Sequence, residues 1–310
     1  MTDTKAADWS NYWRGRTAED AGAALVGAGI EHDAELADFW RGVFGGAPAS
    51  ARVLDLACGA GSALKHAAAA NISKLAGADI SADALKALEK AVPGAVTTEC
   101  SAASTPYEDG IFDFVVSQFG IEYAGLSAAT KEAARLIAPG GTFTAIIHMT
   151  GGGIEQEVSG KLKEGEAIRD IQFIPLAKDM FRTIGSPRSP TNDAIAQKAA
   201  EAFRPAEQAL SKLAAEQGGL AMHLYQGTGQ LYQRRKNYAL ADIHGWLDAM
   251  GAEIDAYIGR MASMIEAAST DEEASAALAI LEDAGCKTQP LETFQLGGKD
   301  AAWVMKAEKH

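Results

Sequence analysis

The sequence has few cysteines, an excess of acidic over basic residues, and no long apolar run. Three cysteines among 310 residues, Cys58, Cys100 and Cys286, are too few and too widely spaced for a disulfide framework or a zinc motif. Lys and Arg total 28 against 41 Asp and Glu, and the net charge of −13 disfavours nucleic-acid phosphates or an anionic membrane as partners. No stretch reaches the roughly 18 apolar residues of a membrane helix, and residues 1–5 lack the pattern of a signal peptide. We therefore expect a cytoplasmic protein with reduced thiols.

What the sequence does contain is enough apolar material for a folded core. Hydrophobic residues make up 47% of the chain and charged residues 22%, which is a globular composition. Domains usually hold about 100–200 residues, so the length predicts one large or two modest domains.

Strand and helix signals alternate in the first half of the chain. Residues 34–44 carry an apolar helical face, and Trp9, Tyr12 and Trp13 are at helical spacing upstream of it. Short apolar runs then recur with helical segments between them. The expected strands are 52–57, 75–79, 94–98, 112–117 and 142–147. This alternation predicts right-handed βαβ units and a parallel sheet with helices on both faces.

The pattern changes after three consecutive glycines at 151–153. Residues 154–270 are mostly helical in periodicity, with a loop expected at 185–190. Strand signals return at 286–294 and 301–305, and their short glycine link predicts an antiparallel hairpin.

The predicted fold is therefore α/β. It has a doubly wound, seven-stranded, mostly parallel sheet with an antiparallel last hairpin, N-terminal helices, and a large helical insert after the fifth strand. The expected divisions are an N-terminal cap (1–47), a core (48–150 and 271–310) and a helical insert (151–270).

The most informative segment is the glycine turn within Val53–Gly61. A strand enters a tight turn with Gly59 and Gly61, and a helix follows. Glycine permits positive φ and close approach by a ligand, and the helix N-terminus offers free N–H groups to an anion. Asp79 ends the next strand, where a carboxylate can accept hydrogen bonds from the ribose hydroxyls of a nucleoside. Dinucleotide-binding proteins place a third glycine or alanine where this chain has Leu64, which disfavours NAD(P) and FAD.

Together with four later segments, this turn resembles the class I S-adenosylmethionine (SAM)-dependent methyltransferases. The likeness covers about residues 48–150 and 271–310. The segments, in family order and spacing, are Val53–Gly61, Gly77–Ser81, Pro106–Ser117, Leu136–Gly141 and Leu281–Cys286. The resemblance implies a Rossmann-like core, SAM as cofactor with S-adenosylhomocysteine as product, and no metal.

The resemblance also assigns residues to the cofactor. The strand and glycine turn would surround the methionine part of SAM, and Asp79 would hold the ribose. The full set is Asp55, Ala57, Cys58, Gly59, Gly61, Asp79, Ile80, Ser101, Ala102, Ser117 and Gln118. Ser101 departs from the family, which commonly has Asp there to accept from the adenine amino group, although a hydroxyl can still accept that bond. We expect Cys58 to be packed and not nucleophilic.

Candidates for the acceptor side follow the fourth and fifth strands, because ligands bind beyond the carboxyl ends of parallel strands. Phe119 would line the acceptor pocket. His148 could act as a base or orient the acceptor, and a structural histidine at a strand end is an equal alternative. Glu122 and Tyr123 are further catalytic candidates, although both also suit the start of a helix.

We expect the helical insert to act as a lid that supplies acceptor specificity. Polar and aromatic residues gather between residues 223 and 238, and the substrate candidates among them are Tyr225, Arg234 and Arg235. The two arginines could pair with a carboxylate or phosphate on the acceptor. A solvated helix face is the more common role for such a charged run.

These observations predict an enzyme that transfers a methyl group from SAM to O or N of a small molecule by in-line displacement. One alternative is a peptide or protein methyltransferase that uses the insert as a docking surface. Another is a SAM-binding sensor or scaffold without catalysis. Nucleic-acid methylation is least favoured, because the chain is acidic and its fourth strand ends in Ser117–Gly120 without an Asn/Asp-Pro-Pro-Tyr/Phe signature. The sequence does not predict an oligomeric state.

Overall fold

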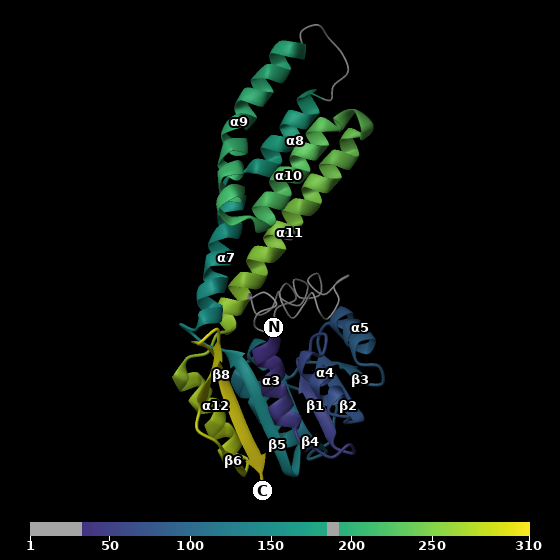
Figure 1. Cartoon of the computed structure of the whole chain (residues 1–310), viewed down its shortest axis with the longest axis vertical. Coiled ribbons are helices and arrows are strands. Elements are labelled where there is room, and N and C mark those ends of the chain that lie inside the picture. Colours follow the sequence, from purple (N-terminus) through teal and green to yellow (C-terminus); the bar gives the residue numbers. More distant parts are fainter. Residues whose placement is uncertain (1–32, 185–191) are drawn as a thin grey trace. The chain divides into compact units, whose positions relative to one another are not determined.

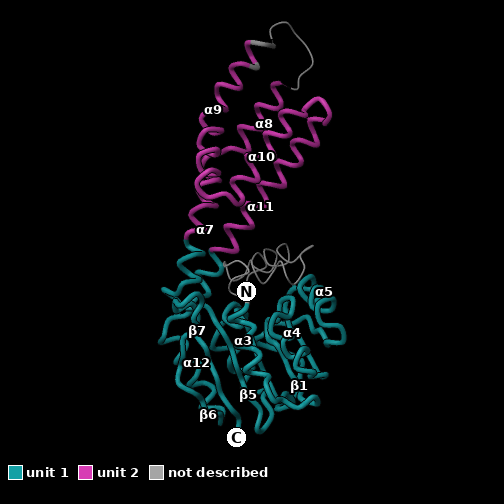
Figure 2. Tube along the Cα trace, viewed as in Figure 1, with its two compact units in different colours: residues 1–159, 262–310 teal, residues 160–261 magenta. Residues whose placement is uncertain are grey.

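The computed structural model describes residues 33–184 and 192–310. Trp9, Tyr12, Trp13 and the loop expected at 185–190 lie outside these residues. The described chain divides into two compact units (Figure 2). Residues 33–159 and 262–310 form the sheet unit, and residues 160–261 form the helical unit.

The sheet unit holds eight strands in the order β3-β2-β1-β4-β5-β8-β6, with β7 also paired to β8 (Figure 1). Strands β1 to β5 are mutually parallel, whereas β8 runs antiparallel to β5, β6 and β7. The bounds are β1 (Arg52–Leu56), β2 (Lys74–Asp79), β3 (Val96–Glu99), β4 (Phe112–Gln118), β5 (Ile137–His148), β6 (Cys286–Thr288), β7 (Glu292–Leu296) and β8 (Lys299–Lys309). The predicted doubly wound, mostly parallel sheet with an antiparallel end is confirmed.

The sheet differs from the prediction in detail near the C-terminus. The single strand expected over 286–294 is two strands, separated by residues 289–291. Pro290 lies in that gap, and proline has no N–H to donate to the ladder of a sheet. The sheet therefore has eight strands, whereas the sequence predicted seven.

Helices cover both faces of the sheet. They are α3 (Asp33–Phe44), α4 (Ser62–Ala69), α5 (Ala82–Ala91), the 3-10 turn η2 (Ile121–Ala124), α6 (Leu126–Leu136) and α12 (Asp271–Asp283). Phe114 packs against Phe44 of α3, with ring centroids 5.9 Å apart. Its neighbour Val115 belongs to the apolar cluster that also contains residues of α6 and α12. Because successive strand residues point to opposite faces, α3 lies on one face and α6 and α12 lie on the other.

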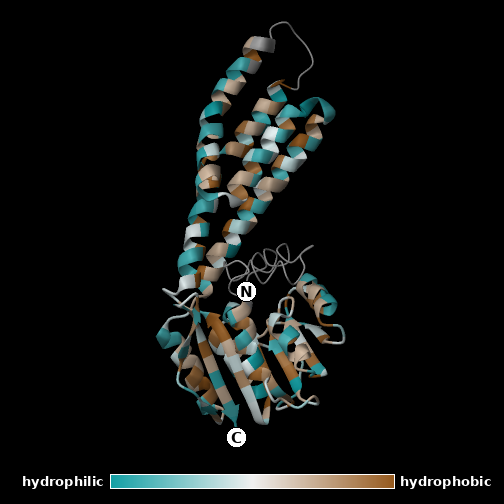
Figure 3. Ribbon diagram, in the orientation of Figure 1, coloured by the Kyte–Doolittle hydropathy of each residue, from teal (hydrophilic) through white to brown (hydrophobic). Residues whose placement is uncertain are grey.

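Hydrophobic positions follow this layering. Brown, apolar residues dominate the central strands in Figure 3, where Leu54, Val115 and Phe143 are fully buried. Local signals fix the ends of the covering helices. Thr270 and Glu273 form a capping box at the start of α12, and Ser81 accepts a hydrogen bond from the N–H of Ala84 at the start of α5.

The helical unit lies within residues 151–270, the segment predicted to be a helical insert after the fifth strand. Its elements are α7 (Gly153–Asp170), α8 (Phe173–Ile184), α9 (Asn192–Gln217), α10 (Gly219–Gln233), the 3-10 turn η3 (Arg235–Asn237) and α11 (Leu240–Ala267). Helix α7 begins in the sheet unit and α11 ends there. The unit has a core of its own, in which Phe181, Leu210, Leu224 and Leu247 are among the most buried residues.

Candidate functional site

The candidate site lies at the carboxyl ends of β1 and β4. The chain passes outward from β1 to β2 and β3, then returns to β4 on the other side of β1. Ligands of open parallel sheets bind at such a switch point. The residues that follow these two strands, Ala57 and Phe119, both have a φ of 53°. Left-handed backbone at non-glycine residues costs of order 1–3 kcal/mol and gathers at functional sites.

The two strand ends approach each other closely. A Cβ added to Gly120 would lie 2.7 Å from the carbonyl oxygen of Ala57. Only glycine leaves enough room for this contact between the segments after β1 and β4. The predicted glycine turn and the segment after β4 therefore form one continuous wall.

The glycine turn is tied to the neighbouring strand. The N–H of Cys58 donates to the carbonyl of Ala78 at 3.1 Å, and the N–H of Gly59 donates to Oδ2 of Asp79 at 2.9 Å. Gly61, with a φ of 81°, forms the N-cap of α4 without a side-chain cap. The first N–H groups of α4 are therefore available to a ligand, as the sequence pattern predicts.

Two carboxylates face this turn. Asp55, on β1, is 2% exposed, and its Oδ1 has no hydrogen-bond partner among the described residues. Burial and the nearby Asp79 charge hold the pKa of Asp55 well above its usual range. Burial also raises the pKa of Asp79, although backbone N–H groups of Ser81 and Gly59 oppose the shift. A cationic hydrogen-bond donor on a ligand would stabilise the buried Asp55 carboxylate through this unpartnered oxygen.

This arrangement fits SAM. The ammonium group of its methionine part would supply the donor that Oδ1 of Asp55 lacks. The Asp79 oxygens accept from Gly59 and Ser81 at 2.9 and 2.8 Å, and each oxygen keeps a second lone pair for a ribose hydroxyl. The Asp55 and Asp79 positions named from the sequence thus lie in one cradle.

Three of the remaining cofactor candidates are engaged in the fold. The thiol of Cys58 is buried, and burial followed by the Asp79 and Asp55 charges raises its pKa well above the usual value. Ser117 is fully buried and donates from Oγ to the carbonyl of Leu56 at 2.8 Å. Ser101 is exposed, and its Oγ accepts from the N–H of Ala103. Ala102 is buried, and Ile80 is half-buried at the end of β2.

One contributor was missed from the sequence. Nε1 of Trp40, on α3, donates to Oε1 of Gln118 at 2.5 Å across 78 positions of sequence. The indole is fully buried and stacks on Phe44. This bond fixes the amide of Gln118 with its NH₂ group left to donate elsewhere. The helical face of residues 34–44 indicated only packing, and no local pattern could have linked Trp40 to Gln118.

The catalytic candidates form a buried pair. Nδ1 of His148, at the end of β5, lies 2.7 Å from Oε1 of Glu122, which also accepts from the His148 backbone N–H at 3.0 Å. The side chains are 2% and 1% exposed. In the tautomer whose Nδ1–H donates to Glu122, Nε2 presents its lone pair. Nε2 is buried and has no hydrogen-bond partner within residues 33–184 and 192–310.

Two aromatic rings enclose this histidine. The Phe119 ring centroid is 4.8 Å from that of His148, and the Tyr123 ring meets it edge-on at 5.8 Å. Burial, followed by the Glu122 charge, raises the pKa of Tyr123 well above its usual range. The four acceptor-side candidates of the sheet unit are thus in direct contact.

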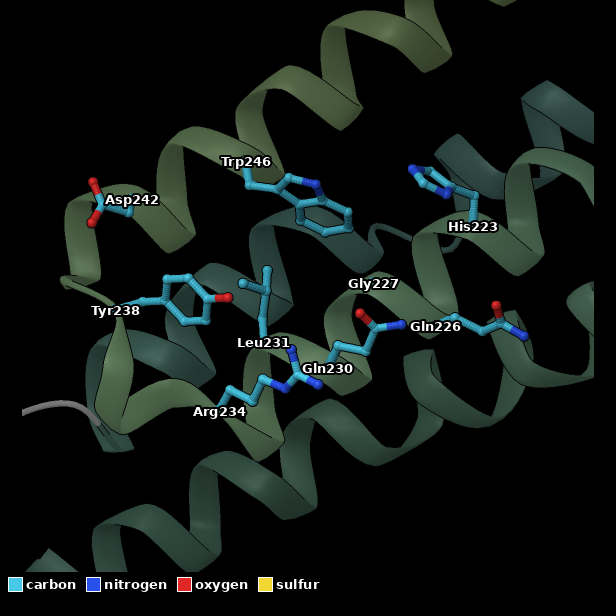
Figure 4. A pocket seen from close by; sticks show the side chains of 9 residues that line it. All are labelled: His223, Gln226, Gly227, Gln230, Leu231, Arg234, Tyr238, Asp242 and Trp246. Atoms are coloured by element: carbon cyan, nitrogen blue, oxygen red, sulfur yellow. The ribbon is translucent and has the colours of Figure 1, made fainter.

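The candidates in the helical unit are separated from one another. Tyr225 lines a cavity of about 520 Å³ beside α8 and α9. Arg234 lines a second cavity, of about 390 Å³, on the α11 side of α10 (Figure 4). Arg235 stacks over the ring of Tyr232 at 4.6 Å and lines neither cavity. The two arginines therefore have different surroundings.

Comparison with known proteins gives a family match within the sheet unit. Residues 54–145 match the family described as a methyltransferase domain. No curated protein matches the chain. Within the described residues, no helix is long and apolar enough to cross a membrane, and no group of three or more His, Cys, Asp or Glu side chains is placed to hold a metal ion.

Solved structures of SAM-dependent methyltransferases resemble the chain. An enzyme of this kind from Mesorhizobium loti is 22% identical over 32% of this chain and 48% of its own, with a TM-score of 0.31. A putative one from Listeria monocytogenes is 21% identical over 38% and 60%, with a TM-score of 0.33. Geranyl diphosphate C-methyltransferase from Streptomyces coelicolor A3(2) is 11% identical over the whole of both chains, with a TM-score of 0.48. The chain thus spans less than two thirds of the first two proteins.

Proposed function

Because residues 54–145 match the family described as a methyltransferase domain, we propose that the protein is a class I SAM-dependent methyltransferase that methylates an oxygen or nitrogen atom of a small molecule. The observation that carries the acceptor assignment is the His148–Glu122 pair. Nε2 of His148 is a buried acceptor without a partner among the described residues, beside the segment after β4. Because this nitrogen is enclosed, the part of the acceptor that reaches it must be small.

The chain's own residues would divide the work as follows. Asp55, Asp79 and the N–H groups of the glycine turn hold the cofactor, and SAM supplies an activated methyl group on a sulfonium. Nε2 of His148 would take the proton that the acceptor's O–H or N–H loses on methylation. Glu122 keeps Nδ1 protonated and stabilises the imidazolium. Phe119 and Tyr123 keep water away from the ring.

Two other functions predict different behaviour. A peptide or protein methyltransferase would need the reacting atom to reach an open surface, which the 2% exposure of the His148 side chain does not favour. A sensor that binds SAM without catalysis would have no use for a buried base with an open lone pair. The pair therefore supports small-molecule catalysis over both.

The test combines calorimetry with an assay for S-adenosylhomocysteine. SAM should bind the wild-type protein, and a panel of small phenols, amines and carboxylic acids should contain an acceptor. His148→Gln should keep SAM affinity within about twofold and lower kcat by about 10²–10⁴, the usual range for loss of general base catalysis. His244→Gln is a matched control, since Nε2 of His244 lies near the Lys178 carbonyl in the helical unit.

The outcomes are distinct. Absence of saturation at millimolar SAM would overturn the proposal altogether. SAM binding without transfer to any small acceptor would favour the sensor, and transfer to peptides alone would favour the protein methyltransferase. A His148→Gln enzyme with wild-type kcat would remove the proposed base.

A further inference from the structure

The helical unit contains a cavity of about 520 Å³ formed by α8, α9 and α10. Pockets for small ligands typically measure about 300–1,000 Å³ and are mostly apolar with a few polar groups. This cavity has that size, and its lining combines an apolar wall with polar side chains. Its apolar wall includes Phe173, Met180 and Phe203, and Tyr225 and Tyr232 add two amphipathic rings.

The apolar wall is well ordered by packing. Phe173 and Phe203 are 2% and 7% exposed, and their ring centroids lie 5.0 Å apart at an interplanar angle of 56°. Rings fixed in this way offer edges and faces to a third ring, which prefers offset or edge-to-face contact. The wall thus favours an aromatic ligand over a flexible polar one.

Thr228 provides the polar group. It lies in the middle of α10, is 4% exposed and lines the cavity, yet its Oγ1 has no hydrogen-bond partner among the described residues. Threonine in a helix usually bonds back to the carbonyl one turn earlier. A buried hydroxyl without a partner destabilises a protein, and valine would fill the same space without that penalty. A ligand that forms a hydrogen bond with Oγ1 of Thr228 would remove this penalty, which would explain why threonine occupies the position.

Charge at the cavity indicates a neutral ligand. Arg204 and Glu207 both line it from α9, three positions apart and opposite in sign. The two charges leave the lining without an excess of either sign that would favour an acid or an amine. Gln226, Gln230 and Gln233 add uncharged amides.

We propose that this cavity is a binding site for a small neutral aromatic molecule whose hydroxyl or carbonyl group hydrogen-bonds to Thr228. The site lies wholly within the helical unit and does not depend on methyl transfer. The cavity of Figure 4, on the other side of α10, shares Gln226 and Gln230 with it. None of the residues that line that second cavity has a buried unpartnered side-chain atom in the described part of the chain. It therefore serves as the control.

The test uses the full-length protein labelled with ¹³C at its methionine methyl groups, of which Met180 lines the cavity. Titration with 1-naphthol should shift the Met180 signal through the ring current. Thr228→Val should weaken 1-naphthol binding by about 2–12-fold, the effect of one neutral hydrogen bond, and leave naphthalene binding unchanged. The same variant should raise the melting temperature, because it removes an unpartnered hydroxyl. Trp246→Phe, in the second cavity, should leave both affinities unchanged.

Three results would overturn the site. The first is a Met180 signal unmoved at millimolar 1-naphthol. The second is equal loss of 1-naphthol and naphthalene binding in Thr228→Val, or no loss of either. The third applies if Thr228→Val does not fold: Thr228→Ser keeps the hydroxyl, so weakened 1-naphthol binding in that variant would contradict the proposal.

Discussion

The sheet unit and the helical unit bury polar groups very differently. Among the described residues, all but two of the buried polar or charged side chains belong to the sheet unit, and the exceptions are Thr228 and Arg260. Asp55, Glu122 and His148 are buried near strand ends. The helical unit is held together chiefly by apolar packing.

The difference shows where this fold keeps its chemistry. Parallel strands end together at one edge, so a few residues after each strand converge without any local sequence signal. Helices packed on an apolar core have no such edge, and their polar side chains are directed to solvent. A buried polar group in the helical unit is therefore isolated, whereas buried polar groups in the sheet unit cluster at the strand ends.

The largest expected effect tests the sheet unit alone. Asp79→Ala removes the ribose acceptor and leaves the N–H groups of Gly59 and Ser81 without their partner. Loss of a charged hydrogen-bond partner is worth about 1.5–3 kcal/mol, so SAM affinity should fall by about 10–100-fold in calorimetry. Binding of 1-naphthol to the helical unit should not change. A parallel loss of both ligands would show that the units are coupled.

The second-largest expected effect is a loss of SAM affinity of about tenfold in Asp55→Asn. It is accompanied by a change in how stability depends on pH. The pKa of Asp55 is raised by burial and by Asp79, so this group favours folding fully below its unfolded pKa, and that contribution is lost as pH rises through the folded pKa. Asp55→Asn should therefore raise the melting temperature at pH 8. SAM's ammonium favours the ionised form, so wild-type SAM affinity should rise with pH and then level off. The variant should bind SAM about tenfold more weakly, by loss of one ionic contact.

A pair of glycines on α10 tests the packing of the helical unit. A Cβ at Gly227 would lie 2.5 Å from the Trp246 indole, whereas a Cβ at Gly229 would meet nothing within 4 Å. Gly229→Ala should stabilise the protein by about 0.5–1 kcal/mol through helix propensity. Gly227→Ala should destabilise it by about 1–3 kcal/mol, as overpacking does. Urea denaturation measures both, and equal changes would contradict the indole contact.

The smallest effect concerns a surface pair at the start of β1. Arg52 donates to Asp113 at 2.9 Å, and this hydrogen bond lowers the pKa of Asp113. Stability from the pair is present above the unfolded pKa and is lost as pH falls through the lowered folded pKa. The side chains are 42% and 38% exposed, so Asp113→Asn should cost less than about 1 kcal/mol at pH 7. Denaturation at pH 7 and pH 3 should show this difference shrinking.

Much of the sheet unit could be predicted from sequence because its signals are local. The apolar run before Gly59 and the acid after β2 predict a strand, a turn and a ligand edge from a few residues each. The Trp40–Gln118 bond could not be predicted in this way. It depends on how a helix packs against a strand 78 positions away in the sequence, which periodicity does not encode. The different surroundings of Arg234 and Arg235 were not predicted either.

The cofactor set shows a similar limit. Asp55 and Asp79 both face the glycine turn, but the hydroxyl of Ser117 is already used in a bond to Leu56. A sequence pattern identifies the position of a polar group and not the partner that it satisfies. The same holds for Thr228, which reads as an ordinary helical residue until its burial is known.

The order of the strands has a consequence for synthesis. Strand β5 is paired along Thr142–His148 with β8, which follows the entire helical unit in the sequence. One side of β5 therefore stays unpaired on the nascent chain while residues 160–261 are made. The helical unit, whose contacts are closer in sequence, can fold in that interval. An exposed edge strand is prone to wrong pairing, so slow elongation after β5 should promote aggregation of this protein.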